Sequence, residues 1–167
     1  RGILRKDSGL RKQKAQDREG AAREFAESRG DYDQAKGLLM EALPGAADAG
    51  QEEECRVLLS KTHLNRGLLL KSQLDRQHLD QDLLQKAKRD YLAALEALRM
   101  VVEARRARGL PRRLEFNFNL AKYHNNLAIL LLQFDPAARE EAEAHGAQAV
   151  ALCKALNVGT PRVRMEL

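Results

Sequence analysis

Residues 122–131 read KYHNNLAILL, and residues 61–70 carry an earlier copy, KTHLNRGLLL. The two stretches begin at Lys61 and Lys122, an offset of 61 residues, and share Lys, His, Asn and the last two Leu. Gly67 in the first copy occupies the place of Ala128 in the second. Polar and small positions match by chance less easily than leucines do. The repeat therefore predicts a chain built from similar helical units.

The composition predicts an ordered, all-α domain. Of the 167 residues, 44% are hydrophobic, 32% are charged and only 4% are aromatic, and the Gly and Pro residues cluster at a few breaks. This balance excludes a disordered chain and favours long helices. No apolar run approaches the roughly 18 residues of a membrane span, and none forms a signal-peptide core. No membrane partner is expected.

The positive charge is concentrated near the start of the chain. Seven Lys or Arg and two Asp between Arg1 and Arg18 account for the whole net charge of +5. This basic N-terminal arm, residues 1–18, is either a solvated segment or one that touches a polyanion. Cys55 and Cys153 lack metal-ligand spacing, and we expect reduced thiols in an intracellular, cytoplasmic protein. A start at Arg instead of Met is expected of a processed chain or a piece of a longer one.

Apolar periodicity and Gly/Pro breaks predict about six helices. Their expected ranges are 10–29, 32–43, 51–73, 80–108, 112–134 and 136–156. Gly30 is expected to separate the first two, with Asp31 as the N-cap of the second. The predicted organisation is a helical domain over residues 19–156 and a tail over 157–167, and its three antiparallel hairpins span about 10–45, 51–108 and 112–156.

Helices of this kind form either a bundle or a solenoid, and the repeat favours the solenoid. Each copy is followed by a helix with small and large residues four apart, as in Ala87 with Tyr91, and residues 30–43, GDYDQAKGLLMEAL, show the same step. The pattern resembles tetratricopeptide (TPR) repeats. The resemblance implies a short right-handed superhelix of stacked hairpins. The offset of 61 in place of about 34 residues implies elongated hairpins, and His63 and His124 stand where the family carries Trp.

The resemblance implies a concave groove that binds a peptide or helix of a protein partner. The implied groove residues are Lys61, Asn65, Lys71, Lys122, Asn125, Asn126 and Gln133. Asn side chains can pair with a peptide backbone, and Lys can pair with an acidic group. Alternatively, the Lys residues are solvated and the Asn residues bond neighbouring helices. The predicted function is a non-enzymatic interaction scaffold, with no cofactor and no metal.

A second basic patch flanks the break at residues 109–111. Its members are Arg105, Arg106, Arg108, Arg112 and Arg113. They suit either a solvated helix end or an acidic partner. Together with the arm, the patch supports the alternative of a nucleic-acid or polyanion-associated protein, and a structural subunit of a larger assembly is a third. Phe116 and Phe118 are predicted to be core residues. His63 and His124 are predicted to be partly buried, hydrogen-bonded packing residues and not catalytic ones.

Overall fold

The computed structural model describes residues 18–157, and every regular element within them is helical. The basic arm, up to residue 17, and the tail, from residue 158, lie outside the described residues, so the expectations for them stay predictions. The chain divides into two compact units, Arg1–Ala94 and Leu95–Leu167. The division falls inside one helix, which contributes its first part to unit 1 and its second part to unit 2. Among the described residues, no helix is long and apolar enough to cross a membrane.

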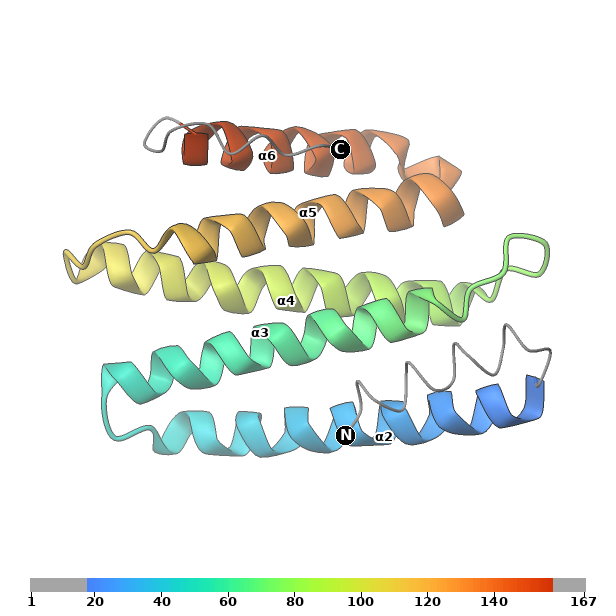
Figure 1. Cartoon of the computed structure of the whole chain (residues 1–167), viewed down its shortest axis with the longest axis horizontal. Helices are drawn as coiled ribbons and strands as arrows, with labels where there is room; N and C mark the ends of the chain where they lie inside the picture. The colour runs from blue at the N-terminus through green and yellow to red at the C-terminus, as the bar shows by residue number, and fades with distance from the viewer. Residues whose placement is uncertain (1–17, 158–167) are drawn as a thin grey trace. The chain divides into compact units, whose positions relative to one another are not determined.

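Unit 1 contains α2, α3 and the start of α4. Helix α2 (Arg18–Ala42) ends in a short 3-10 turn, η1 (Leu43–Gly45), and α3 (Ala49–Lys71) runs back beside it (Figure 1). Asp48 caps α3, because its Oδ1 accepts hydrogen bonds from the backbone N–H of Gly50 at 2.8 Å and of Gln51 at 2.9 Å. Phe25, Tyr32 and Leu69 form a buried cluster across this hairpin.

The predicted break at Gly30 is wrong, because α2 runs through it without interruption. Gly30 is exposed and a Cβ there would meet nothing, so the position is an ordinary helix surface. A single Gly in a helix costs roughly 1 kcal/mol relative to Ala, and burial of Phe25 and Tyr32 on either side outweighs that cost. Asp31 therefore lies within α2 and is not an N-cap. The described residues contain five α-helices where the sequence predicted about six.

The remaining helix boundaries lie close to their predicted places. Helix α4 (Gln81–Ala107) was predicted over 80–108, and α5 (Leu114–Phe134) over 112–134. In α4 the largest part of the buried apolar face recurs every three or four residues, which is the periodicity of a helix with one buried side: Leu84, Ala87, Tyr91, Ala94, Leu98 and Val101. The two cysteines, Cys55 and Cys153, are free.

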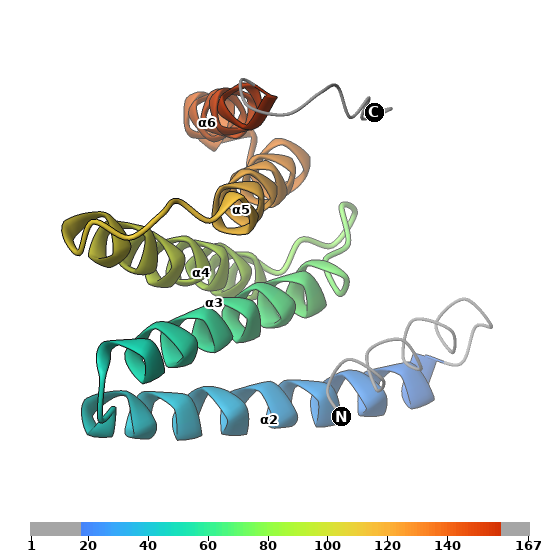
Figure 2. The same cartoon turned by 60° about the vertical axis from the view of Figure 1, so that its left-hand side comes forward.

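Unit 2 contains the rest of α4, α5, the 3-10 turn η2 (Pro136–Ala138) and α6 (Arg139–Asn157). Helices α5 and α6 form an antiparallel hairpin, seen from two sides in Figures 1 and 2. Leu127, Leu130 and Leu131 of α5 are fully buried. Phe116 is also buried, but the prediction for Phe118 is wrong, since it is 48% exposed. Two residues along a helix turn through about 200°, so Phe118 faces away from Phe116.

Candidate functional site

A pocket in unit 2 lies at the turn between α4 and α5, and we call it the arginine pocket. It has a volume of about 560 Å³. Its lining residues are Val102, Arg105, Arg106, Gly109, Leu110, Arg112, Arg113, Phe116 and Asn117. The lining combines four guanidinium groups with three apolar side chains and contains no acidic residue. A pocket of this composition can hold a ligand with both negative charge and apolar surface.

The C-terminal turn of α4 shapes one wall of this pocket. The backbone N–H of Leu110 donates to the carbonyl of Arg105, and the N–H of Gly109 donates to that of Arg106, both at 3.0 Å. This is the Schellman arrangement, which requires a left-handed residue after the helix, and Gly109 supplies it with φ of 66°. The motif folds Leu110 back over the last turn of α4, which holds two of the four arginines.

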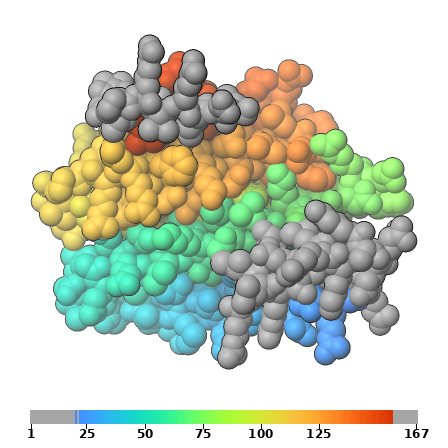
Figure 3. Space-filling view, viewed as in Figure 1, coloured from blue at the N-terminus to red at the C-terminus, as the bar shows by residue number. Residues whose placement is uncertain are grey.

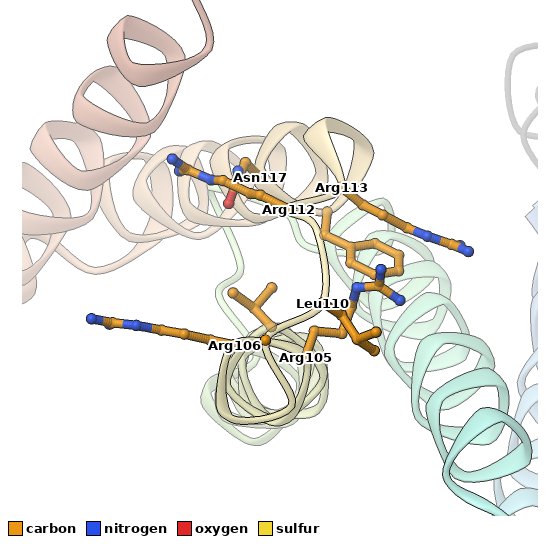
Figure 4. Close-up of a pocket in the computed structure, with 9 residues that line it drawn as sticks. Arg105, Arg106, Leu110, Arg112, Arg113 and Asn117 are labelled. Carbon is orange, nitrogen blue, oxygen red and sulfur yellow. The ribbon is translucent and has the colours of Figure 1, made fainter.

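Two of the four arginines pack against the ring of Phe116. The guanidinium carbons of Arg105 and Arg113 lie 6.0 and 5.6 Å from the centroid of the Phe116 ring, and Arg105 also donates to the carbonyl of Pro111 at 3.0 Å. Figure 4 shows Arg106 and Arg112 extending together to one side of the turn, and Arg113 to the other. Arg106 and Arg112 thus reach toward the same side of the pocket mouth (Figure 4).

The start of α5 adds to the positive character of the pocket. The N-cap residue of α5 is Arg113, whose side chain makes no capping hydrogen bond. The first-turn N–H groups of a helix carry partial positive charge and need an acceptor. Asn117, in the first turn, is buried, and with its amide oriented to satisfy its neighbours it accepts hydrogen bonds from the guanidinium of Arg112. The pocket therefore combines four side-chain charges with a helix N-terminus.

Four of the five arginines predicted as a basic patch line the pocket, and Arg108 does not. Arg108 is exposed, and its Nε donates to the carbonyl of Ala104 one turn earlier at 3.1 Å. The sequence did not identify the pocket's apolar lining, Val102, Leu110 and Phe116. The Gly-Leu-Pro break at residues 109–111 was a usable signal, since a Schellman turn brings the residue after Gly back toward the helix.

The predicted groove residues divide between the two units. In α5, Lys122, Asn125 and Gln133 are exposed and Asn126 is half-buried. Phe118 and Leu132 share the exposed surface of this helix, at 48% and 57% exposure. Side chains of α5 form a broad band of surface in the space-filling view, yellow to orange in Figure 3.

In α3 of unit 1, Lys61 is exposed, whereas Asn65 and Lys71 are half-buried. Burial lowers the pKa of the Lys71 amine below its usual value. The predicted groove residues thus lie on two helices, α3 in unit 1 and α5 in unit 2. Whether the two sets act on one ligand stays a prediction.

Both histidines of the repeat are hydrogen-bonded packing residues, as predicted. In unit 1, the Nδ1 of His63 lies 3.0 Å from Oδ1 of the buried Asp90. In unit 2, the Nδ1 of the buried His124 lies 2.8 Å from Nδ1 of His145, and its Nε2 lies 3.1 Å from Nη2 of Arg99. Within residues 18–157, no three His, Cys, Asp or Glu side chains gather into a set that could hold a metal ion.

No protein-family model, curated protein or solved structure matches this chain. The function must therefore be argued from its own residues.

Proposed function

We propose that this protein is a non-enzymatic helical binding module that recognises an acidic, partly apolar segment of a protein partner. The arginine pocket carries the proposal, because its lining combines four arginines with apolar side chains and contains no acidic residue. Acidic side chains of the partner would pair with Arg106 and Arg112, and an apolar side chain would contact Leu110. Binding of this kind requires neither a cofactor nor a reaction.

The exposed surface of α5 extends the proposed site away from the pocket. Phe118 and Leu132 offer apolar contacts, and Lys122 and Asn125 offer charge and hydrogen bonds on the same helix. A segment of ten or so residues could reach from the pocket along this helix, since an extended chain spans about 3.3 Å per residue and a 21-residue helix about 31 Å. The predicted groove residues of α5 are thus part of the proposal.

A TPR-like architecture and a cytoplasmic location belong to the same proposal. Support for the architecture is local to each unit. In unit 1, Gly67 of α3 packs directly against Tyr91 of α4. In unit 2, Ala128 of α5 and Ala142 of α6 are buried. Small residues at these positions allow helices to approach closely, as the TPR pattern requires.

The pocket favours a peptide over a nucleic acid. Single-stranded nucleic acids bind by stacking bases on free aromatic side chains beside positive charge. Phe116 is the aromatic residue of the pocket, and it is buried beneath Arg105 and Arg113. Two of the protein's own guanidinium groups therefore already lie over its ring.

Selection from a library of random 12-residue peptides displayed on phage tests the proposal. We expect the wild-type chain to enrich peptides that combine Asp or Glu with Leu, Ile or Phe. Peptides made from the enriched sequences should bind at least tenfold more weakly to the double variant Arg106→Ala/Arg112→Ala, because two charge-assisted contacts are lost. Lys122→Ala should weaken binding about two- to fivefold.

Arg139→Ala is the matched control, since this arginine of α6 lies in the same unit, is exposed and pairs with Glu143 at 2.9 Å. It should leave the affinity unchanged. Enrichment without acidic residues would overturn the proposal. So would tighter binding of a single-stranded oligonucleotide than of any selected peptide at 150 mM salt, which would favour the polyanion alternative.

A further inference from the structure

A second pocket lies entirely within unit 1, where residues of α2, α3 and α4 meet, and we call it the histidine pocket. It has a volume of about 660 Å³. Its lining residues are Arg29, Asp33, His63, Arg66, Leu70, Lys86, Arg89, Asp90 and Ala93. Four cationic and two acidic side chains line it, so the net charge is positive even with His63 neutral. Only two lining residues are apolar, in contrast to the arginine pocket.

The two carboxylates of this pocket are already engaged. Asp90 is 2% exposed, and its Oδ2 accepts from Nε of Arg66 at 2.6 Å while its Oδ1 contacts His63. The Nη1 of Arg66 pairs with Asp33. Two carboxylates thus share one guanidinium, and this group carries a net charge of −1 that the other cations of the pocket outweigh. The other cations of the lining are Arg29, Lys86 and Arg89.

These three cations lie on two helices, and they differ in the ion pairs that they make. Lys86 pairs with Asp82 one turn earlier on α4, and Arg89 acts on the same carboxylate through space. Arg29, on α2, is exposed, and among the described residues it makes no ion pair. Arg29 and Arg89 are therefore the side chains with the most capacity to bind an anion.

Asp90 also fixes how His63 can act. A carboxylate only accepts hydrogen bonds, so the Nδ1 of His63 must carry the proton that it donates to Asp90. The Nε2 of the neutral ring is then a hydrogen-bond acceptor. His63 lines the pocket, and within the described chain its Nε2 has no hydrogen-bond partner. The pocket thus pairs excess positive charge with one oriented acceptor.

We propose that the histidine pocket binds a small oxyanion that carries a hydroxyl group, of which hydrogen phosphate is the simplest. Arg29 and Arg89 pair with the charged oxygens, and the P–OH donates to Nε2 of His63. An anion without a proton to donate would leave Nε2 unpaired and place two acceptors against each other. The site lies in unit 1 and does not depend on the peptide site proposed for unit 2.

Titration with inorganic phosphate and with sulfate, at pH 7.5 and matched ionic strength, tests the site. Sulfate has similar size and charge but carries no proton at this pH. We expect phosphate to bind with a Kd of millimolar or below and sulfate at least fivefold more weakly. In NMR spectra, phosphate should shift the ring signals of His63 and leave those of His78, an exposed residue, in place. Equal binding of the two anions, or unshifted His63 signals, would overturn the proposal.

Substitution of exposed arginines distinguishes a specific anion site from general electrostatic attraction. Arg29→Ala and Arg89→Ala should each weaken phosphate binding at least threefold. Arg23→Ala, on the same helix as Arg29 but paired with Glu27, is the control and should have no effect. Equal losses in all three variants would mean nonspecific attraction and would contradict the proposal.

The variant His63→Leu should bring the affinities for phosphate and sulfate together. Should this variant fail to fold, the wild-type ring shifts and the arginine variants still decide the outcome.

Discussion

The two copies of the sequence repeat place the same residue in opposite chemical settings. His63 of unit 1 bonds to Asp90, a buried carboxylate that also holds Arg66. His124 of unit 2 bonds to another imidazole, that of His145, and its other nitrogen faces Arg99. The first histidine belongs to a network with a carboxylate, and the second to a pair of imidazoles beside one guanidinium.

The difference shows that the partner helix, and not the repeated helix, decides what a repeated side chain does. In the second copy the Nε2 of His124 accepts from Arg99, so its Nδ1 carries the proton and donates to His145. Protonation of either ring would remove an acceptor from this chain of bonds. In the first copy the carboxylate accepts from a neutral and from a protonated ring alike. The two sites should therefore respond differently to mutation and to pH.

Replacing Asp90 with Ala should have the largest effect. It would leave the guanidinium of Arg66 and the ring of His63 without the carboxylate that compensates their burial. Breaking a buried ion pair by removing one partner costs about 3–5 kcal/mol, and we expect the free energy of unfolding to fall by that amount in urea denaturation followed by circular dichroism.

Asp82→Ala is the matched control on the same helix. Asp82 is exposed and pairs with Lys86, and an exposed pair of this kind adds little to stability. The variant should denature at the wild-type urea concentration. If the Asp90→Ala and Asp82→Ala variants denature at the same urea concentration, the hydrogen bonds and ion pair of Asp90 do not stabilise unit 1.

Acidification should act through His124 with the next largest effect. Burial, followed by the neighbouring His145 and Arg99, lowers the pKa of His124 from 6.5 to about 4. Between these two pH values the unfolded chain binds more protons than the folded chain at this residue. The contribution of the neutral ring is therefore complete above pH 6.5 and is lost as the pH falls toward 4. The full loss is on the order of 3 kcal/mol.

Comparing the pH dependence of urea denaturation in wild type and His124→Gln isolates this contribution. The charged and titratable groups that face the ring are Arg99 of α4 and His145 of α6, with Glu141 beside the latter at 3.9 Å. The variant should lose stability less steeply than wild type between pH 6.5 and 4. His78→Gln, at an exposed position, should reproduce the wild-type profile. Parallel profiles for His124→Gln and wild type would mean that the pKa of His124 is not lowered in the folded chain.

The sequence predicted the parts of this molecule that depend on local pattern. The three- and four-residue spacing in α4 gave its buried face, and the breaks at residues 44–45 and 109–111 gave helix ends within about three residues. Four arginines of the candidate site were also identified, because they flank one of these breaks. Gly30 misled the prediction, since a local helix breaker was outweighed by the burial of Phe25 and Tyr32.

The partners of the polar side chains could not be predicted in the same way. Asp90 stands 27 residues after His63, and His145 stands 21 residues after His124. Such pairs depend on how one helix is registered against the next, which periodicity alone does not determine. One signal was available, because Asp90 lies three residues after Ala87 and four before Ala94, on the apolar stripe of α4. A charged residue at such a position indicates a buried partner of opposite charge.

The smallest expected effect concerns the small residue of each copy, Gly67 in the first and Ala128 in the second. A Cβ on Gly67 would lie 3.3 Å from Cε1 of Tyr91 and 3.4 Å from Cβ of Asp90, and the Tyr91 ring is fully buried and cannot easily move. Crowding of about 1–2 kcal/mol should outweigh the roughly 1 kcal/mol that Ala gains over Gly in a helix, so Gly67→Ala should lower the free energy of unfolding by up to about 1 kcal/mol. Gly30→Ala, where a Cβ meets nothing, should raise it by about 0.5–1 kcal/mol. Urea denaturation of both variants measures the two changes in the free energy of unfolding. An increase at both positions would mean that the close approach of α3 to Tyr91 does not require a glycine.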